Sequence, residues 1–479
     1  MPKIKVQKKR ENRVANGNHR QTEKKRILYH STNRSLKLGN TAVFSEKVTF
    51  KEALFMGQAP DEGLFMPTEL PRLSEPEIAG LRGRPYHDVA YEILNKFLSC
   101  EIKAGELKAI TGDVYDFILP IEKLSHYVHI LRLDRGPTAS FKDFAAGMMA
   151  RLMERLKPED KEIRILVATS GDTGSAVGAA YRGMDGIKVY VLYPDSEVTP
   201  VQKKQMDSIG GNVKTIAIDG KFDDCQKIVK RAFSDPDLET LNLTSANSIN
   251  IGRILPQIVY YFYSYINVVD DWQSVIFSVP SGNFGNSLGC EMARRMGLPV
   301  NKIIIATNEN DEFPKYLKCG VYRKIEPSRK CLSNAMNVGN PSNLARYFDL
   351  YGGVLNKEGL VCKKADLGEM NRRLYSTAVS DRETIRTIKS VYEKFGTVVE
   401  PHGAGGIAAL CKYFEKNEKM LSICLETAHP GKFPEIVQKE LNISPEPPES
   451  LRKLEGTTTA VVYLPNDYGT LKEYLIGKA

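Results

Sequence analysis

The stretch IRILVATSGDTGSAVGAAY, residues 163–181, predicts a buried strand that turns through a glycine-containing loop into a helix. The same pattern recurs in SVIFSVPSGNFGNSLGCEMARRMG, residues 274–297. Short apolar runs at 188–194, 213–218 and 302–307 read as further strands between helical segments. Because strands that alternate with helices form parallel sheets covered on both faces, we expect an α/β fold.

Two glycine loops in these units are candidate binding sites. The loops T-S-G-D-T-G (169–174) and S-G-N-F-G-N (281–286) each follow a strand and open a helix. In α/β sheets ligands bind beyond the carboxyl ends of the strands, where backbone N–H groups at a helix start can face an anion. The alternative for each loop is that its glycines only serve a tight turn.

Lys142 lies in PTASFKDFAAG (137–147), at the predicted first turn of a helix. Pro137 and Thr138 are start signals, and apolar residues at helical spacing give that helix a core-facing stripe. The helix dipole disfavours a cation at this end. A crowded site of this kind lowers the pKa of a lysine and makes its amine available for a Schiff base. The alternative is an ordinary lysine that extends its ammonium group into water.

A third loop favours a different class of enzyme. Strand-like TVVE (397–400) precedes G-A-G-G-I-A (403–408), which matches the dinucleotide pattern G-x-G-x-x-A, and the strand-like LSICLE ends at Glu426. Only one further strand-like stretch, 458–464, follows, which is too little for a nucleotide-binding domain. A fourth loop, TAHPGKF, places the hydroxyl of Thr427 directly after the LSICLE strand.

Composition and charge narrow the class of protein. The chain has 479 residues, 42% of them hydrophobic and 26% charged, as in ordinary globular proteins. Residues 1–26 hold ten Lys or Arg against two Glu, out of a net charge of +9, and we expect this basic tail to be disordered. The rest is close to neutral, which argues against a nucleic-acid partner. The longest apolar stretch, 254–269, contains polar residues and predicts a buried helix, so we expect no membrane partner.

The spacing of the cysteines and histidines does not predict a metal site. The eight cysteines contain no C-x-x-C pair, and the seven histidines form no H-E-x-x-H motif. This pattern is typical of reduced thiols, so we expect a cytoplasmic protein, with organelle targeting by the basic tail as the alternative.

Taken together, the motifs resemble those of the threonine synthases and threonine synthase-like phospho-lyases, which are fold-type II pyridoxal-phosphate enzymes. The matching runs follow the family order over roughly residues 27–440: QAPDEGLFMP, GPTASFKDFA, ATSGDTGSAV, LYPDSEVTPVQKKQM, FDDCQKIVK, SANSINIGRILPQIVYYF, SGNFGN, SNAMNVGNPSN and ETAHPGKF. The resemblance implies a tryptophan synthase β-like fold with parallel-sheet large and small domains and an N-terminal domain. It implies the boundaries 27–110 for the N-terminal domain, 111–141 and 255–479 for the large domain, and 142–254 for the small one.

The resemblance also implies roles for particular residues. Lys142 would form the Schiff base with pyridoxal 5'-phosphate and carry protons, and Thr427 would meet the pyridine nitrogen as a neutral hydroxyl. The cofactor phosphate would rest on Gly282, Asn283, Phe284, Gly285 and Asn286. The loop Thr169, Ser170, Gly171, Asp172 and Thr173 would bind the substrate carboxylate, with Asp172 also reaching the cofactor ring. The substrate phosphate would lie at Ser248, Asn250 and Arg253.

The implied reaction converts O-phospho-L-homoserine and water to L-threonine and phosphate. The alternative is a phospho-lyase that eliminates phosphate from phosphohomoserine or phosphothreonine and yields 2-oxobutanoate. A third reading is a regulatory protein that has lost catalysis. Three departures from the family pattern leave the product open: Asn337 in place of aspartate, Gly403–Gly406 after the histidine, and Glu426 in place of alanine. Glu426 could approach the cofactor ring or point to the opposite face of its strand. We expect a small phosphorylated amino acid as the partner and a monomer or homodimer.

Overall fold

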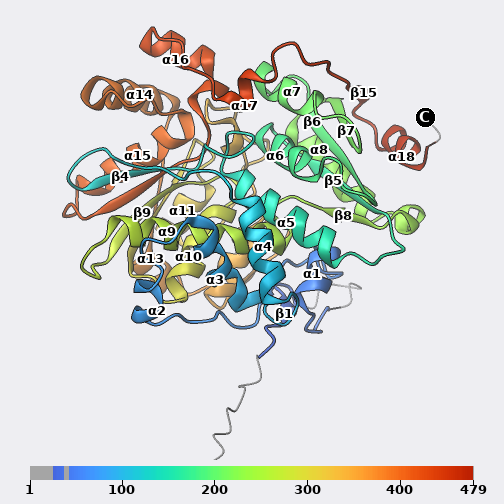
Figure 1. Cartoon of the computed structure of the whole chain (residues 1–479), viewed down its shortest axis with the longest axis horizontal. Helices are drawn as coiled ribbons and strands as arrows, with labels where there is room; N and C mark the ends of the chain where they lie inside the picture. Colours follow the sequence, from blue (N-terminus) through green and yellow to red (C-terminus); the bar gives the residue numbers. More distant parts are fainter. Residues whose placement is uncertain (1–24, 37–42, 478–479) are drawn as a thin grey trace, which may run out of the picture.

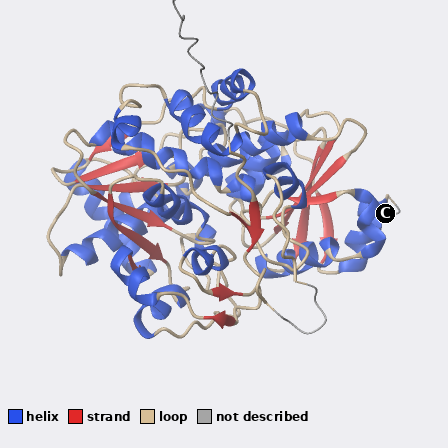
Figure 2. Ribbon diagram, turned by 90° about the horizontal axis from the view of Figure 1, so that it is seen from below, coloured by secondary structure: helices blue, strands red, loops and turns tan. Residues whose placement is uncertain are grey.

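The fold is built on two main β-sheets, which lie side by side with helices packed around them (Figures 1 and 2). The computed structural model describes residues 25–36 and 43–477. The larger sheet contains, in order, β13 (Leu374–Ala378), β10 (Val300–Thr307), β9 (Val275–Pro280), β14 (Ser422–Glu426), β4 (Val128–Arg132) and β3 (Ile121–Lys123). Its neighbours are parallel except β3 and β4.

The smaller sheet is parallel throughout. Its order is β15 (Val462–Pro465), β7 (Val213–Asp219), β6 (Ile187–Pro194), β5 (Ile163–Ala168) and β8 (Leu243–Ser245). Two antiparallel pairs complete the strands: β1 (Tyr29–Ser31) with β2 (Phe65–Pro67), and β11 (Val354–Leu355) with β12 (Val361–Lys363). The two parallel sheets confirm the α/β class expected from the sequence.

The helices fall into groups along the chain. The N-terminal region contributes α1 (Phe50–Met56), α2 (Glu75–Ala79), α3 (Tyr86–Leu98) and α4 (Ala104–Val114), and α5 (Lys142–Leu156) follows between the sheets. The smaller sheet carries α6 (Asp172–Tyr181), α7 (Pro200–Asp207), α8 (Phe222–Phe233) and α18 (Tyr468–Ile476). The remaining α-helices are α9 (Val259–Val268), α10 (Gly285–Arg295), α11 (Glu312–Cys319), α12 (Leu344–Leu350), α13 (Leu367–Arg373), α14 (Asp381–Phe395), α15 (Pro401–Phe414), α16 (Pro434–Leu441) and α17 (Glu449–Arg452).

Five short 3₁₀ helices among the described residues connect these elements. They are η1 (Pro236–Leu241), η2 (Ile251–Arg253), η3 (Leu255–Ile258), η4 (Asn334–Met336) and η5 (Pro430–Lys432). One continuous hydrophobic core joins the N-terminal helices, α5, α9 and the facing sides of both sheets. This shared core fixes the position of each sheet's carboxyl edge, where the loops of the site begin.

Most elements expected from the sequence are confirmed. The predicted strands at 163–168, 188–194, 213–218 and 302–307 correspond to β5, β6, β7 and β10, and the apolar stretch 254–269 forms η3 and α9. The helix predicted at Lys142 begins at that residue, although its N-cap is Phe141 and not Thr138.

The dinucleotide-loop reading is wrong. Residues 397–400 form no strand, because Glu400 caps the N-terminus of α15 by accepting the N–H groups of His402 and Gly403, and Pro401 occupies the first helical position. The glycines of 403–408 therefore lie inside the first turns of α15. They form no loop that a pyrophosphate could enter.

The end of the chain returns to the smaller sheet. β15 pairs with β7, and α18 packs on α8. This differs from the sequence-based segmentation, which groups all of 255–479 with the larger sheet. The division into domains stays a prediction, and the basic tail lies outside the described residues except for Lys25 and Arg26.

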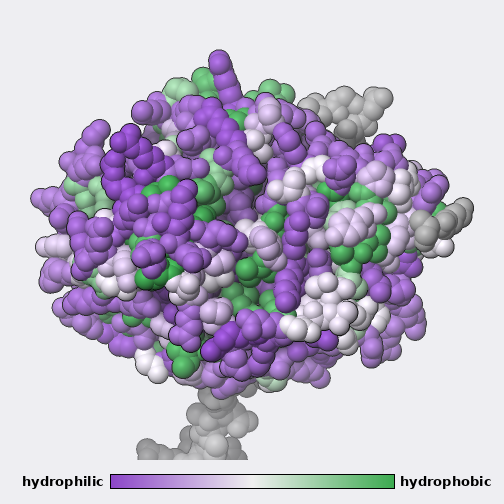
Figure 3. All heavy atoms as spheres, turned by 90° about the horizontal axis from the view of Figure 1, so that it is seen from above, coloured by the Kyte–Doolittle hydropathy of each residue, from purple (hydrophilic) through white to green (hydrophobic). Residues whose placement is uncertain are grey.

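The surface is largely hydrophilic on the face shown in Figure 3, with hydrophobic residues in small separate groups. No helix within 25–36 and 43–477 combines the length and the apolarity that crossing a membrane requires.

Candidate functional site

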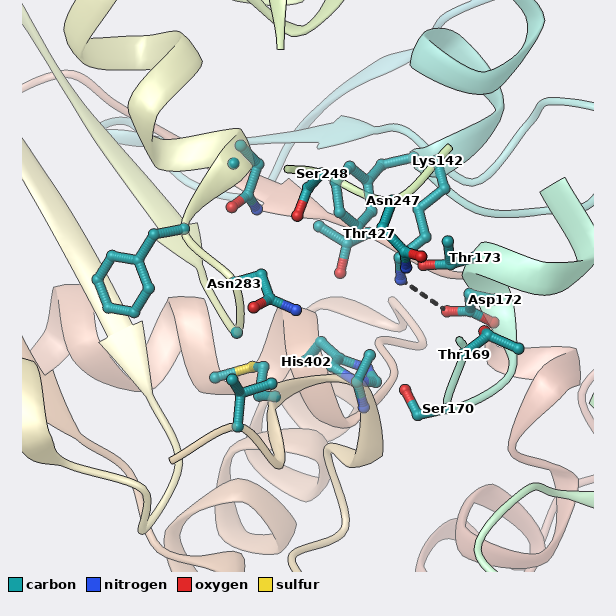
Figure 4. Close-up of a pocket in the computed structure, with 18 of the residues that line it drawn as sticks. Lys142, Thr169, Ser170, Asp172, Thr173, Asn247, Ser248, Asn283, His402 and Thr427 are labelled. Atoms are coloured by element: carbon teal, nitrogen blue, oxygen red, sulfur yellow. Dashed lines mark hydrogen bonds and ion pairs between the residues drawn. The ribbon is translucent and has the colours of Figure 1, made fainter. Parts of the chain in front are cut away.

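One cavity lies where the carboxyl ends of β5, β9 and β14 meet (Figure 4). Its empty space is about 810 Å³, part of it open to solvent. Thirteen of the fifteen predicted site residues line it: Lys142, Thr169, Ser170, Asp172, Thr173, Ser248, Arg253, Gly282, Asn283, Phe284, Gly285, Asn286 and Thr427. These residues come from loops far apart in sequence, and the two sheets bring them together.

Lys142 extends from the start of α5 into this cavity, where Figure 4 shows its ammonium facing Asp172. The Lys142 Nζ to Asp172 Oδ2 distance is 3.7 Å, and the lysine side chain is 13% exposed. Burial lowers the pKa of Lys142, and the nearby cations Lys432 and Arg253 lower it further, against the opposing effect of Asp172. A lowered pKa leaves more of the amine uncharged at neutral pH, the form that attacks a carbonyl.

Asp172 is shared between two lysines. Its Oδ1 lies 2.7 Å from Lys432 Nζ, a fully buried ammonium that also donates to the carbonyl of Thr138 at 3.0 Å. Gln202 Nε2 donates to the same carboxylate oxygen at 2.8 Å. Burial favours the neutral acid, but the two lysines and Gln202 outweigh it and hold the pKa of Asp172 well below its usual value. Asp172 is therefore an ionised neighbour of Lys142 whose stronger partner is Lys432.

The loop 281–284 forms an anion cradle at the N-terminus of α10. Phe284 adopts the left-handed conformation at φ +62°, and the backbone N–H groups of 282–286 donate to no other described residue. The Asn286 side chain stabilises the turn by donating to the carbonyl of Pro280 at 2.8 Å. A Cβ on Gly282 would lie 2.4 Å from the carbonyl oxygen of Ala335, so only glycine fits there. Free N–H groups at a helix start suit a phosphate.

Thr427 also lines the cavity and is almost fully buried. Its hydroxyl donates to Glu400 Oε1 at 3.4 Å. Glu400 also accepts from His402 Nδ1 at 2.5 Å, and His402 lines the cavity. The carboxylate of Glu400 thus accepts hydrogen bonds from two residues that line the cavity, Thr427 and His402.

Arg253 brings a second positive group to the cavity. It is 4% exposed, its Nη1 donates to the carbonyl of Ala246 at 2.6 Å, and its Nε is buried without a partner among the described residues. Burial lowers the pKa of Arg253 to about 10, which still leaves it charged at neutral pH. A buried guanidinium with an unused donor, and with no carboxylate of the described residues within ion-pair distance, suits an anionic ligand.

The loop beside Arg253 is fixed by another buried arginine. Arg346, on α12, donates to the carbonyls of Ser248 at 2.9 Å, Ile249 at 2.7 Å and Phe65 at 3.0 Å. Its neighbour Asn343 donates to the Ser248 hydroxyl at 3.1 Å. These bonds hold Ser248 at the cavity wall.

Two predicted residues do not line the cavity. The amide of Asn250 is used inside the protein, where its Nδ2 donates to the carbonyls of Leu54 and Ser245 and its Oδ1 accepts the Gly252 N–H. Gly171 is the N-cap of α6, and its N–H donates to Thr169 Oγ1. Both residues shape the loops that carry their neighbours.

Sequence reasoning missed several residues of the site. The unpredicted lining residues are Phe141, Ala168, Phe222, Asn247, Gln257, Pro280, Ala335, Met336, Val338 and His402. Lys432 and Glu400 do not line the cavity, but each contacts a residue that does: Lys432 contacts Asp172, and Glu400 contacts Thr427. The runs ETAHPGKF and VEPHGAGG contain Lys432, Glu400 and His402, so the positions could have been noticed, but their contacts are set by tertiary packing.

The chain matches three family models. Residues 118–425 match the model described as pyridoxal-phosphate dependent enzyme, residues 37–115 the threonine synthase N terminus, and residues 403–475 the threonine synthase C-terminal region. Threonine synthase of Haemophilus influenzae is 37% identical over 433 residues, which are 90% of this chain and 97% of that protein. The chain belongs to the threonine synthase family.

Solved structures of this family have the same fold. Pyridoxal-phosphate-bound threonine synthase from Brucella melitensis superposes with a TM-score of 0.85 at 32% identity, covering 94% of this chain and 99% of that one. Threonine synthase from yeast gives 0.84 at 31% identity, covering 94% and 98%. The chain is thus a fold-type II, pyridoxal-phosphate-dependent enzyme of the threonine synthase family, as the sequence motifs predicted.

The residues present fit that cofactor. The free N–H groups of 282–286 suit its phosphate, the Lys142 amine suits its aldehyde, and the Thr427 hydroxyl suits its ring nitrogen. Glu426 does not line the cavity, so of its two expected orientations the structure has the one that faces away.

Lys432 provides a test of the electrostatics at Lys142. Replacing Lys432 by methionine removes a cation that lowers the pKa of Lys142 and leaves Lys142 as the lysine paired with Asp172. Both changes raise the pKa of Lys142, so a given fraction of free amine is reached only at higher pH. We expect added pyridoxal phosphate to attach roughly tenfold more slowly at neutral pH, measured as the growth of visible absorbance across a pH series. Lys432→Arg keeps the charge and should stay near wild type, whereas an unchanged profile in Lys432→Met would contradict the assignment.

Proposed function

We propose that this chain converts O-phospho-L-homoserine and water to L-threonine and inorganic phosphate. The observation that carries the proposal is that one cavity is lined by an amine and by two candidate anion sites. Its lining includes Lys142, the loop 282–286 with its free backbone N–H groups, and the buried guanidinium of Arg253. A phosphorylated substrate and a phosphorylated cofactor require two such sites.

Pyridoxal phosphate, when bound, joins the substrate's amino group and withdraws electrons from its Cα, so that protons at Cα and Cβ become acidic. The cradle of 282–286 would hold the cofactor phosphate, and Thr427 would hold the ring nitrogen. Lys142 would hold the cofactor until substrate arrives.

The substrate would be held by two groups of residues. The loop Thr169–Thr173 opens α6, and its hydroxyls and N–H groups suit the α-carboxylate. Arg253 and Ser248 would bind the phosphate on Cγ, which places the leaving group in a buried and positively charged end of the cavity.

Lys142 would then act as the proton carrier. Its uncharged amine would take the proton from Cα, release that proton to the bound cofactor, and then, uncharged again, take a proton from Cβ, after which phosphate would leave from Cγ towards Arg253. Protons returned to Cγ and Cα, together with water added at Cβ, complete threonine. Asp172 would stabilise the ammonium form of Lys142 each time the amine gains a proton.

One assay decides between this reaction and its alternatives. The full chain is incubated with pyridoxal phosphate and O-phospho-L-homoserine, and phosphate, threonine and 2-oxobutanoate are measured together. We expect threonine and phosphate in equal amounts. Mainly 2-oxobutanoate would establish the phospho-lyase instead, and no phosphate release would favour the regulatory protein. A parallel incubation without pyridoxal phosphate controls for hydrolysis that is independent of the cofactor.

The cytoplasmic location and the monomeric or homodimeric state stay predictions. The first rests on the cysteine spacing, and a size measurement in solution tests the second.

A further inference from the structure

A glycine and a glutamate meet behind the cavity. Gly403 is in the first turn of α15, and Glu426 is the last residue of β14. A Cβ built on Gly403 would lie 1.6 Å from Glu426 Oε2 and 2.7 Å from its Cδ. The Glu426 side chain is 1% exposed and cannot move aside into solvent. The carboxyl group therefore occupies space that exists only because residue 403 lacks a side chain.

The Glu426 carboxyl is hydrogen-bonded to the backbone of Glu400. Its Oε1 accepts the N–H of Glu400 at 2.8 Å, while its Oε2 is buried without a partner among the described residues. Three charged groups face it: Glu400 at the start of α15, Arg132 on the paired strand β4, and Asp134 just after that strand. Arg132 is engaged by Asp134 at 2.7 Å.

These surroundings favour the neutral acid. Burial raises the pKa of Glu426 well above its usual value, and the nearby Glu400 raises it further, against the opposing effect of Arg132. A neutral carboxyl can accept the Glu400 N–H with one oxygen and carry its proton on the other. Ionisation would place two buried negative groups side by side.

Glu400 in turn accepts hydrogen bonds from two residues that line the cavity, His402 and Thr427. The N–H of Ala335 donates to His402 Nε2 at 3.1 Å, so that nitrogen has no hydrogen and the ring hydrogen is on Nδ1. Nδ1 therefore donates to Glu400 Oε2 at 2.5 Å, and Thr427 donates to Oε1. Glu400 accepts every one of these bonds, as a carboxylate does. Any shift of the Glu400 backbone moves the groups that hold Thr427 and His402.

We propose that Glu426, seated in the space left by Gly403, is a positioning residue that fixes the backbone of Glu400 and through it orients Thr427 and His402 toward the cofactor ring. The proposal rests on the proposed function in that it places the cofactor ring in this cavity. Neither Glu426 nor Gly403 touches the reacting atoms.

The contact is tested first without the cofactor, by thermal unfolding of the full chain. Gly403→Ala should lower the unfolding midpoint clearly in the wild-type background and much less in Glu426→Ala, because the clash is then gone. Gly405→Ala is the matched control on the same helix, since a Cβ there meets nothing within 4 Å. Equal effects of Gly403→Ala in both backgrounds would overturn the proposed contact, whatever reaction the chain catalyses.

The positioning role is tested by the bound cofactor's absorbance and fluorescence. Glu426→Ala should shift both spectra, and Glu426→Gln, which keeps the shape and is always neutral, should restore them. Wild type should lose stability relative to Glu426→Gln as pH rises, because the unfolded chain releases this proton at a lower pH than the folded one. Spectra unchanged in Glu426→Ala would overturn the positioning role. Absence of any cofactor signal in wild type would instead overturn the proposed function.

Discussion

Lys142→Ala is expected to abolish the visible absorbance of bound pyridoxal phosphate and to lower the rate of phosphate release by about a thousandfold or more. The reason is that in the proposed reaction the amine serves twice, as the group that holds the cofactor and as the carrier of substrate protons. The fold should survive, because Asp172 keeps its 2.7 Å contact with Lys432. Absorbance spectra and single-turnover phosphate release measure the two roles separately.

Lys142→Arg is the matched variant for this experiment. Arginine retains a cation beside Asp172 but offers no free amine at neutral pH. We therefore expect it to be as inactive and as colourless as the alanine variant. Substantial activity in Lys142→Arg would show that charge alone is needed at this position and would contradict the assignment.

Arg253→Met is expected to raise the KM for O-phospho-L-homoserine by about ten- to a hundredfold. The variant removes charge-assisted hydrogen bonds, each of which contributes about 1.5–3 kcal/mol. Methionine fills similar space, and the wild-type guanidinium is buried without a carboxylate partner, so thermal stability should change little or rise. Steady-state kinetics and an unfolding curve check both parts.

Cofactor binding should be unaffected by this substitution. Its phosphate is expected on the N–H groups of 282–286, so the absorbance of bound pyridoxal phosphate in Arg253→Met should match wild type. Arg253→Lys, which keeps the charge without the paired donors, should fall between the two in KM. Loss of cofactor binding in Arg253→Met would mean that Arg253 serves the other phosphate.

Local pattern was enough to predict the parts of the fold that are regular. The strands that became β5, β6, β7 and β10 are buried on both faces over most of their length, so apart from a polar or charged residue near the start of each their sequences are largely apolar runs that stand out. Lys142 and the two glycine loops could be predicted for a similar reason, because a strand, a turn and a helix start are all encoded within about twenty residues.

One error comes from a local helix cap, and the other misses come from contacts distant in sequence. TVVE has the composition of a strand, but the Glu400 side chain caps α15 and Pro401 starts it, so the segment ends in a helix N-cap. Asn250 has a side chain suited to a ligand, yet two backbone carbonyls from other segments occupy its amide. The pairing of Lys432 with Asp172 joins residues 260 positions apart, and no local pattern encodes it.

The placement of Arg346 makes the catalytic core depend on the segment before it. One buried guanidinium bonds simultaneously to the carbonyl of Phe65 near the start of the chain and to the 248–249 turn, whose Ser248 lines the cavity. A fragment beginning at residue 118 would keep every residue of the cavity wall and still lose one of the acceptors that hold this cation. The N-terminal region thus takes part in holding the turn at the cavity wall.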